Sequence, residues 1–179
     1  MHKQPIFDSV RGVNNIMIKF IKGDLIELTK QFKFDIVIHG CNIYHTMGAG
    51  IAKQIKENFP HVYEADKATE YGDLTKVGKW SFGVNKEIGL GGSKYCVIVN
   101  AYTQSAFSDG SNDVFSYDGF ETILKDISDK CPHQSIGMPL IGCGLAGGNK
   151  ERILKIIQDT IGHMDVTIVE WCKMKLHIQ

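Results

Sequence analysis

The stretch Ile38-His39-Gly40-Cys41-Asn42-Ile43-Tyr44-His45-Thr46-Met47-Gly48-Ala49-Gly50-Ile51-Ala52 reads as a buried strand, a polar turn, a glycine-rich step and the start of a helix. A second glycine-rich turn, Pro139-Leu140-Ile141-Gly142-Cys143-Gly144-Leu145-Ala146-Gly147-Gly148, also runs from a strand towards a helix. Backbone N–H groups at helix starts favour anions. Because ligands of open α/β sheets bind beyond the carboxyl ends of the strands, we expect both turns to share one crevice. A bridged diphosphate suits such a pair of turns.

The size and composition predict a single globular domain. The 179 residues are 43% hydrophobic and 22% charged, which is ordinary for such a domain. A chain of this length buries roughly 70% of its unfolded surface and needs no metal or disulfide to fold. Lys+Arg and Asp+Glu both number 20, so the net charge gives no indication of non-specific attraction to nucleic acid or to a membrane.

The cysteines indicate a reducing compartment. Cys41, Cys96, Cys131, Cys143 and Cys172 are odd in number and no pair has CxxC spacing, so we expect free thiols and a cytoplasmic location. No apolar run approaches the ~20 residues of a membrane span, and no signal peptide is visible, so we expect no membrane association. The absence of HExxH, zinc-type Cys/His spacing and aspartate clusters predicts no metal site, and no cofactor is expected.

Predicted strands and helices alternate along the chain. Apolar runs predict strands at 16–20, 35–39, 80–84, 95–100, 135–140 and 166–171. Helical periodicity predicts helices at 25–29, 50–59, 61–71, 115–127 and 149–161, the last with Asn149 as N-cap. Strands 80–84 and 95–100 form a hairpin in this interpretation, and 103–113 is a flexible loop. The order predicts one α/β domain with a largely parallel sheet over residues 16–179, after a loose N-terminal extension over residues 1–15.

Each glycine-rich turn has two interpretations. Gly48-Ala49-Gly50 is either a tight strand-to-helix turn or an anion-binding turn, and the presence of two such turns before helices favours the second. Neither GxGxxG nor GxxxxGK[ST] occurs, so the dinucleotide and P-loop fingerprints are absent. The segment 142–148 holds four glycines in seven residues. Such density indicates close backbone approach or positive φ, and the alternative is a floppy loop.

Asp24 and Asn42 are candidate polar contacts of a ligand. Asp24 follows the first predicted strand in Lys22-Gly23-Asp24-Leu25 and is either a helix N-cap or an acceptor for an exocyclic amine such as the adenine N6. Asn42 either closes an Asx turn or hydrogen-bonds a pair of sugar hydroxyls. The two interpretations of each residue do not exclude each other.

Two histidines flank the first turn and are the candidate proton-transfer groups. His45 lies in the polar turn and is the better candidate for a general acid or base, because an unperturbed imidazole titrates near pH ~6.5. His39 is expected to be half-buried and to orient its neighbours. For each histidine the alternative is a structural role. Cys143 lies near a helix start that could lower its pKa, but we favour a packing role because no base is paired with it in the sequence.

Aromatic residues near the expected crevice are candidates to stack on a purine. They are Trp171, Tyr102 and Phe107. For each of them, the alternative is a place in the hydrophobic core. Gln104 lies past the end of a predicted strand and therefore on the crevice side.

At these residues the chain resembles the macrodomain family, which binds ADP-ribose. The resemblance runs from about Ile16 to Trp171, and its shared marks are Lys22-Gly23-Asp24-Leu25, the segment from His39 to Ala52, and Met138-Pro139-Leu140-Ile141-Gly142-Cys143-Gly144-Leu145. It implies a three-layer α/β/α fold with a mixed, largely parallel sheet. Asp24 would contact adenine with Leu25 beside it, and Asn42 would hold the distal ribose. The residues expected to wrap the diphosphate and distal ribose are Gly48, Ala49, Gly50, Ile51, Ile141, Gly142, Cys143, Gly144, Leu145, Ala146 and Gly147.

Within the family the chain resembles the branch of ADP-ribose-1''-phosphate phosphatases and terminal ADP-ribose glycohydrolases. The glycohydrolases use a lysine after the strand that is expected to end at Asn100, and an aspartate where this chain has Ala146. The hydrolases marked by GGGVDGAIH have an aspartate where this chain has Ala52. The interpretation that remains is a phosphatase that converts ADP-ribose-1''-phosphate to ADP-ribose, with His45 and His39 as the available catalytic groups. We expect the protein to be a monomer. The alternatives are a non-catalytic ADP-ribose reader and an enzyme that removes ADP-ribose from modified macromolecules.

Overall fold

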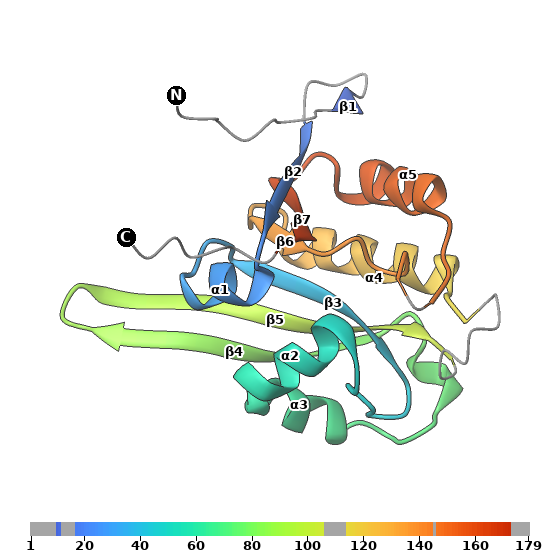
Figure 1. Ribbon diagram of the computed structural model, residues 1–179, viewed down its shortest axis with the longest axis horizontal. Helices are drawn as coiled ribbons and strands as arrows, with labels where there is room; N and C mark the ends of the chain where they lie inside the picture. Colours follow the sequence, from blue (N-terminus) through green and yellow to red (C-terminus); the bar gives the residue numbers. More distant parts are fainter. Residues whose placement is uncertain (1–9, 12–16, 106–113, 145, 173–179) are drawn as a thin grey trace.

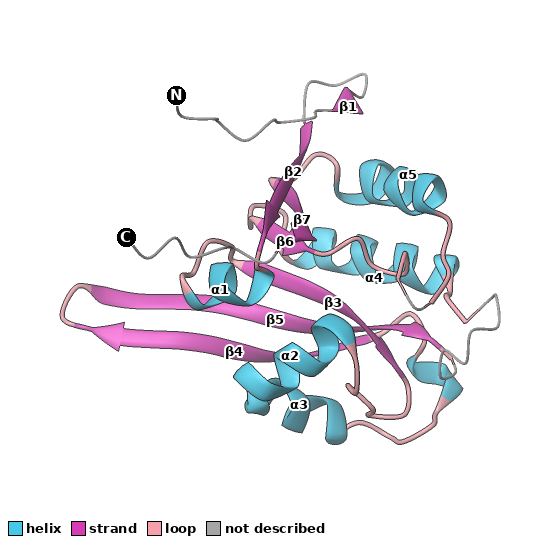
Figure 2. Cartoon of the chain, in the orientation of Figure 1, coloured by secondary structure: helices cyan, strands magenta, loops and turns pink. Residues whose placement is uncertain are grey.

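The computed structural model describes residues 10–11, 17–105, 114–144 and 146–172, which form a sheet between two layers of helices (Figure 1). The strands are β1 (Val10–Arg11), β2 (Met17–Gly23), β3 (Ile36–Asn42), β4 (Trp80–Gly89), β5 (Gly92–Gln104), β6 (Ile136–Met138) and β7 (Val166–Trp171). The helices are α1 (Leu25–Lys30), α2 (Gly50–Asn58), α3 (Pro60–Lys67), the 3-10 helix η1 (Leu74–Lys76), α4 (Tyr117–Lys130) and α5 (Lys150–Ile161). Figure 2 shows the two kinds of element by colour.

The described strands form one seven-stranded sheet in the order β1-β2-β7-β6-β3-β5-β4. Parallel pairing joins β2 to β7, β7 to β6, β6 to β3 and β3 to β5. The pairs β1–β2 and β4–β5 are antiparallel. The predicted mixed, largely parallel sheet and the predicted hairpin are therefore confirmed.

The two faces of the sheet are covered by different helices. Ile38 packs in a core cluster with residues of α4 and α5, and its neighbour Val37 packs in a second cluster with residues of α1, α2 and α3. Both side chains are fully buried. A strand covered on both faces needs apolar residues at successive positions, which explains the continuous apolar run in β3.

Several elements differ in extent from the prediction. β3 continues through Gly40 to Asn42, and β5 continues to Gln104, because polar side chains inside the strands find buried partners. Asn100, for example, donates to the carbonyl of Val62 in α3. α3 ends at Lys67 instead of residue 71, because both the amide and the hydroxyl of Thr69 donate to the Asp66 carbonyl.

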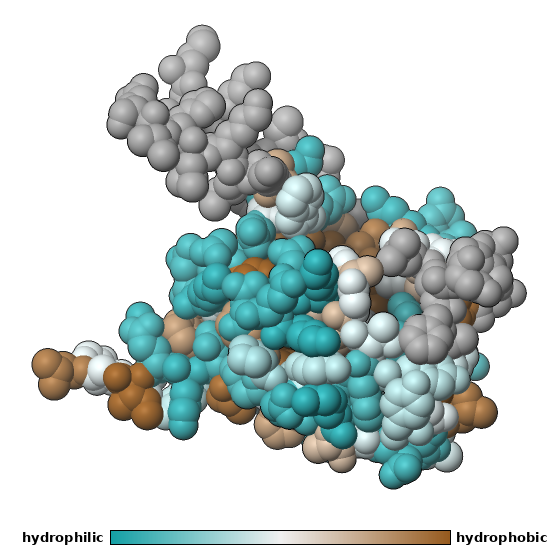
Figure 3. All heavy atoms as spheres, turned by 60° about the horizontal axis from the view of Figure 1, so that its bottom comes forward, coloured by the Kyte–Doolittle hydropathy of each residue, from teal (hydrophilic) through white to brown (hydrophobic). Residues whose placement is uncertain are grey.

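The sequence did not predict β1 and η1. β1 lies within the expected loose extension and pairs with β2. Of the expected loop at 103–113, residues 106–113 lie outside the described residues. The β4–β5 hairpin is longer than predicted and extends beyond the helices, so that Ile88 and Leu90 expose apolar side chains at its tip (Figure 3). Among the described helices, none combines the length and apolarity needed to cross a membrane.

Candidate functional site

A cavity of about 490 Å³ lies between the two glycine-rich turns. The turns follow β3 and β6, which pair in parallel, so their carboxyl ends meet at one edge of the sheet. β3 contributes Gly40 and Asn42, and the first turn with the start of α2 contributes residues 46–52. The second turn contributes residues 139–142, Gly144 and Ala146, and β5 contributes Gln104. The predicted crevice is present, and of the residues expected to bind ligand it brings together Asn42, Gly48, Ala49, Gly50, Ile51, Ile141, Gly142, Gly144 and Ala146.

The start of α2 opens on this cavity. Its N-cap residue is Ala49, and no side chain caps the helix, although Gly50, Ile51 and Ala52 in its first turn line the cavity. Gly50 has φ 56°, a left-handed conformation that favours glycine. The first N–H groups of a helix lack intrahelical acceptors and carry partial positive charge. This nine-residue helix therefore offers its donors to an anion in the cavity.

The second turn is held in shape by its own backbone. Gly148 donates to the carbonyl of Gly142 (2.8 Å), and Gly147 donates to that of Gly144 (3.1 Å). Gly142 has φ 83°, and a Cβ there would lie 2.6 Å from the ring of Phe115. The turn is therefore closely packed, which agrees with the prediction of close backbone approach. Unlike α2, the helix after this turn is capped, because the Asn149 side chain accepts from the Arg152 amide.

The polar side chains of the cavity are neutral. Asn42 Oδ1 accepts from the amide of Tyr44 (2.9 Å) and from the hydroxyl of Thr46 (3.4 Å), so the predicted Asx turn is present. The Asn42 amino group has no hydrogen-bond acceptor among the described residues and remains available to a ligand. Gln104 lies beside Asn42 in the β3–β5 register. None of the described residues that line the cavity carries an ionisable side chain.

His39 does not line the cavity. It is fully buried, and its Nε2 lies 2.7 Å from Asn100 Oδ1. The Asn100 amide donates to Val62 and Ser81, so its oxygen faces His39 and the imidazole donates from Nε2. Burial lowers the pKa of His39 to about 4, against the opposing effect of the Asn100 hydrogen bond. The expectation of a half-buried residue is wrong, because alternation along β3 turns this ring towards α3.

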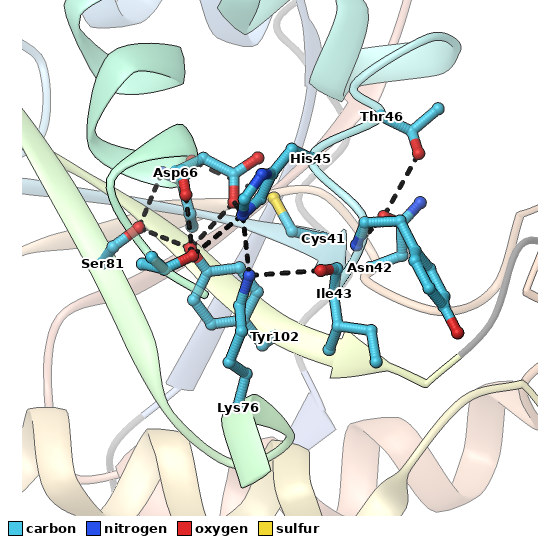
Figure 4. A network of polar contacts seen from close by, with 12 residues as sticks. Cys41, Asn42, Ile43, His45, Thr46, Asp66, Lys76, Ser81 and Tyr102 are labelled. Carbon is cyan, nitrogen blue, oxygen red and sulfur yellow. Dashed lines mark hydrogen bonds and ion pairs between the residues drawn. The ribbon is translucent and has the colours of Figure 1, made fainter. Parts of the chain in front are cut away.

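His45 belongs to the first turn, and its side chain points towards Asp66 and Lys76 (Figure 4). Its Nε2 is 3.1 Å from both Lys76 Nζ and Thr69 Oγ1, and 3.9 Å from Asp66 Oδ1. Burial lowers the pKa of His45, opposed by the charge of Asp66. The structure thus places neither predicted catalytic histidine among the residues that line the cavity.

No family model matches the chain, but a known protein is similar to it along most of its length. The chain is 36% identical over 161 residues to an uncharacterized 17.5 kDa protein in the tk-vs intergenic region of Enterobacteria phage T4, with 87% of this chain and 97% of that protein covered. The chain belongs to the family of this phage protein.

Solved macrodomains have the same fold. The macrodomain of Thermus aquaticus DarG gives a TM-score of 0.59 at 25% identity, covering 87% of this chain and 96% of that one. Thermosipho africanus DarTG in complex with ADP-ribose gives a TM-score of 0.62 at 18% identity, covering 96% of this chain and 45% of that one. The three-layer α/β/α macrodomain fold expected from the sequence is therefore confirmed.

Asp24 and Trp171 lie at the carboxyl ends of β2 and β7, on the same side of the sheet of this macrodomain as the cavity. Neither residue lines the cavity. One oxygen of Asp24 caps α1, accepting from the amides of Ile26 (2.8 Å) and Glu27 (3.2 Å). Trp171 pairs with Gly23 in the β2–β7 register and is 64% exposed. The N-cap interpretation of Asp24 is confirmed, and its role towards adenine stays a prediction.

Other predicted ligand residues lie elsewhere in the macrodomain. The Leu25 side chain, at the start of α1, is buried in the core, and the place of Leu25 beside adenine stays a prediction. Tyr102 is buried with its hydroxyl on Asp66, so its ring is not available to stack on a base. Cys143 packs against the core, and burial raises the pKa of its thiol, as the predicted packing role requires. Gly147 is outside the lining. Leu145 and Phe107 lie outside the described residues.

Sequence reasoning missed part of the lining. The missed residues are Gly40, Thr46, Met47, Ala52, Pro139 and Leu140. Gly40 carried a usable signal, since a glycine within a buried strand often marks close approach of another segment. A Cβ at Gly40 would lie 3.0 Å from Ile141, so its absence lets the second turn pack against β3.

Asn100, which stands at the place expected for the glycohydrolase lysine, lies inside β5 and is fully buried. The residue that ends this strand at the cavity is Gln104, which is neutral. Among the described residues, no group of three or more His, Cys, Asp or Glu side chains is arranged to hold a metal ion.

The buried neutral His39 predicts a pH-dependent stability. Between pH 6.5 and pH 4, His39 is protonated in the unfolded chain but stays neutral in the folded protein, where its pKa is about 4. Lowering the pH through this range therefore favours the unfolded state, and the folded state loses stability. Between pH 7 and pH 5 we expect a loss of about 2 kcal/mol from this residue. Urea unfolding of His39→Gln should lack this component, whereas the exposed control His133→Gln should retain it. Parallel pH profiles for the wild type and His39→Gln would contradict the assignment.

Proposed function

We propose that this macrodomain binds ADP-ribose in the cavity between its two glycine-rich turns. The observation that carries the proposal is the uncapped start of α2, which opens on a cavity whose described lining is free of ionisable side chains. Acidic side chains in the lining would repel a diphosphate, and neutral amides avoid that repulsion. The volume of about 490 Å³ is within the usual range for a small-molecule site.

Each part of ADP-ribose has a proposed contact. The diphosphate lies on the N–H groups at the start of α2 and against Gly142 and Gly144 of the second turn. The Asn42 amino group donates to the distal ribose. Adenine extends along the sheet edge towards Asp24, whose second carboxylate oxygen accepts from the exocyclic amine, and Trp171. The complex of Thermosipho africanus DarTG with ADP-ribose supports this choice of ligand for a chain of the same fold.

Filling the cavity tests the binding proposal. A Cβ at Gly144 meets nothing within 4 Å, and Gly144 lines the cavity, so Gly144→Val adds bulk to the ligand space without a clash at Cβ. We expect calorimetry to show ADP-ribose binding to the wild type and affinity weakened by about tenfold or more in Gly144→Val.

The matched control is Gly91→Val in the β4–β5 hairpin turn, where a Cβ also meets nothing within 4 Å. It should bind like the wild type. Equal affinities for all three proteins would remove the cavity as the site, and no binding to the wild type would reject ADP-ribose as the ligand.

Hydrolysis of ADP-ribose-1''-phosphate to ADP-ribose and phosphate is the second candidate. The observation that favours it is the position of His45 directly before Thr46, which lines the cavity. Because burial lowers the pKa of His45, its imidazole is neutral at pH 7 and can accept a proton. The ring would first have to leave Lys76 and Thr69. Removal of ADP-ribose from macromolecules has less support, because Asn100 and Ala146 stand where the resemblance places the lysine and the aspartate of the glycohydrolases.

A phosphate-release assay separates binding from catalysis. On the binding proposal, the wild type binds ADP-ribose-1''-phosphate and releases no phosphate above a no-enzyme control. Phosphate release that falls about 10²–10⁴-fold in His45→Ala would establish the second candidate instead, since general acid–base catalysis contributes about that much. His39→Ala serves as the comparison. Turnover that neither substitution affects would exclude both histidines from the chemistry.

A further inference from the structure

The back of the first turn rests on a buried cluster of charged and polar side chains that the proposed binding contacts do not use (Figure 4). The cluster combines Lys76 from η1, Asp66 from α3, Tyr102 from β5 and His45 from the turn itself. Asp66 is 1% exposed and Lys76 is 5% exposed. Lysine and aspartate are rarely this buried unless they are paired, so the cluster calls for a structural or functional reason.

Lys76 holds the turn at two points. Its ammonium donates to the carbonyl of Ile43 (3.2 Å) and to the Nε2 of His45 (3.1 Å). It also lies 4.3 Å from the centroid of the Tyr102 ring, a cation–π contact. One side chain from a distant 3-10 helix therefore binds the first and third residues of the turn at the same time.

The position of Lys76 is itself supported by Tyr102 and its partners. The Tyr102 hydroxyl donates to Asp66 Oδ1 (2.9 Å) and lies 2.8 Å from Ser81 Oγ. Burial lowers the pKa of Lys76, and the charge of Asp66 opposes that effect. Tyr102 connects the two residues, because its hydroxyl binds Asp66 and its ring lies against the Lys76 ammonium.

The turn has a backbone that needs such support. His45 (φ 52°) and Met47 (φ 34°) are both left-handed although neither is glycine. Conformations of this kind are unfavourable for residues other than glycine and persist only where the surroundings impose them. Thr46, between the two, faces the cavity, and the cavity-lining start of α2 follows directly. The contacts of the turn on the side away from the cavity therefore determine where the start of α2 presents its N–H donors.

We propose that Lys76 is a positioning residue for the ligand-binding turn, acting through the Ile43 carbonyl and the His45 ring on the N–H groups at the start of α2. The proposal rests on the proposed ADP-ribose site for its effect on affinity. Its effect on the turn is independent of any ligand. No contact between Lys76 and ADP-ribose is required, since Lys76 does not line the cavity.

Lys76→Met tests the proposal, because methionine keeps an unbranched stem and removes the ammonium donors. Loss of a charge-assisted hydrogen bond corresponds to about tenfold or more in affinity, so we expect the Kd for ADP-ribose to rise by that factor at a temperature where the variant is fully folded. Without ligand, hydrogen exchange of residues 43–53 should be faster in Lys76→Met than in the wild type. Lys79→Met, which replaces an exposed lysine close to η1, should change neither quantity.

The outcomes separate three explanations. A lower melting temperature with unchanged Kd and unchanged exchange in 43–53 would make Lys76 merely structural and overturn the proposal. Faster exchange in the variant, with no ADP-ribose binding by the wild type, would reject the proposed function and keep the positioning role. Should Lys76→Met not fold, His45→Leu leaves the Lys76–Ile43 bond in place and should still raise the Kd about threefold or more; an unchanged Kd there would overturn the proposal.

Discussion

The parallel pairing of β3 with β6 is the constraint on which the site depends. The register Ile36↔Ile136 and Val37↔Gly137 brings the carboxyl ends of both strands to one edge. Each strand continues into a glycine-rich turn, so the two turns face each other across a cavity. Gly40 completes the arrangement, because a side chain there would crowd Ile141 of the second turn. The pairing therefore positions both turns for the contact with one diphosphate that we propose.

The molecule separates neutral donors from buried charges on the two sides of one turn. The cavity side presents the uncapped start of α2 and the amide of Asn42. The opposite side holds Asp66, Lys76 and the neutral ring of His45. A binding surface for an anion gains from fixed dipoles that need no reorganisation, and fixed dipoles need a rigid support. The buried cluster provides a support of this kind in the part of the chain that the structure describes.

The sequence predicted the elements and the crevice, because both follow from local patterns. The alternation of apolar runs, the Asn149 cap and the two glycine-rich turns are readable within short windows. The orientation of the histidines was not readable in this way. Once β3 is seen to extend to Asn42, alternation places His39 on the same face as Val37, away from the cavity. The direction of His45 depends on a left-handed backbone and on Lys76, which lies 31 residues further along the chain.

If both turns bind one diphosphate with their backbone amides, these amides respond together to the ligand. An amide NMR titration of the 15N-labelled protein with ADP-ribose measures that response. We expect the signals of Gly50, Ile51, Gly142 and Gly144 to shift together and to saturate with a single Kd. Shifts confined to one turn, or centred on the far end of the β4–β5 hairpin, would contradict binding of one diphosphate by both turns.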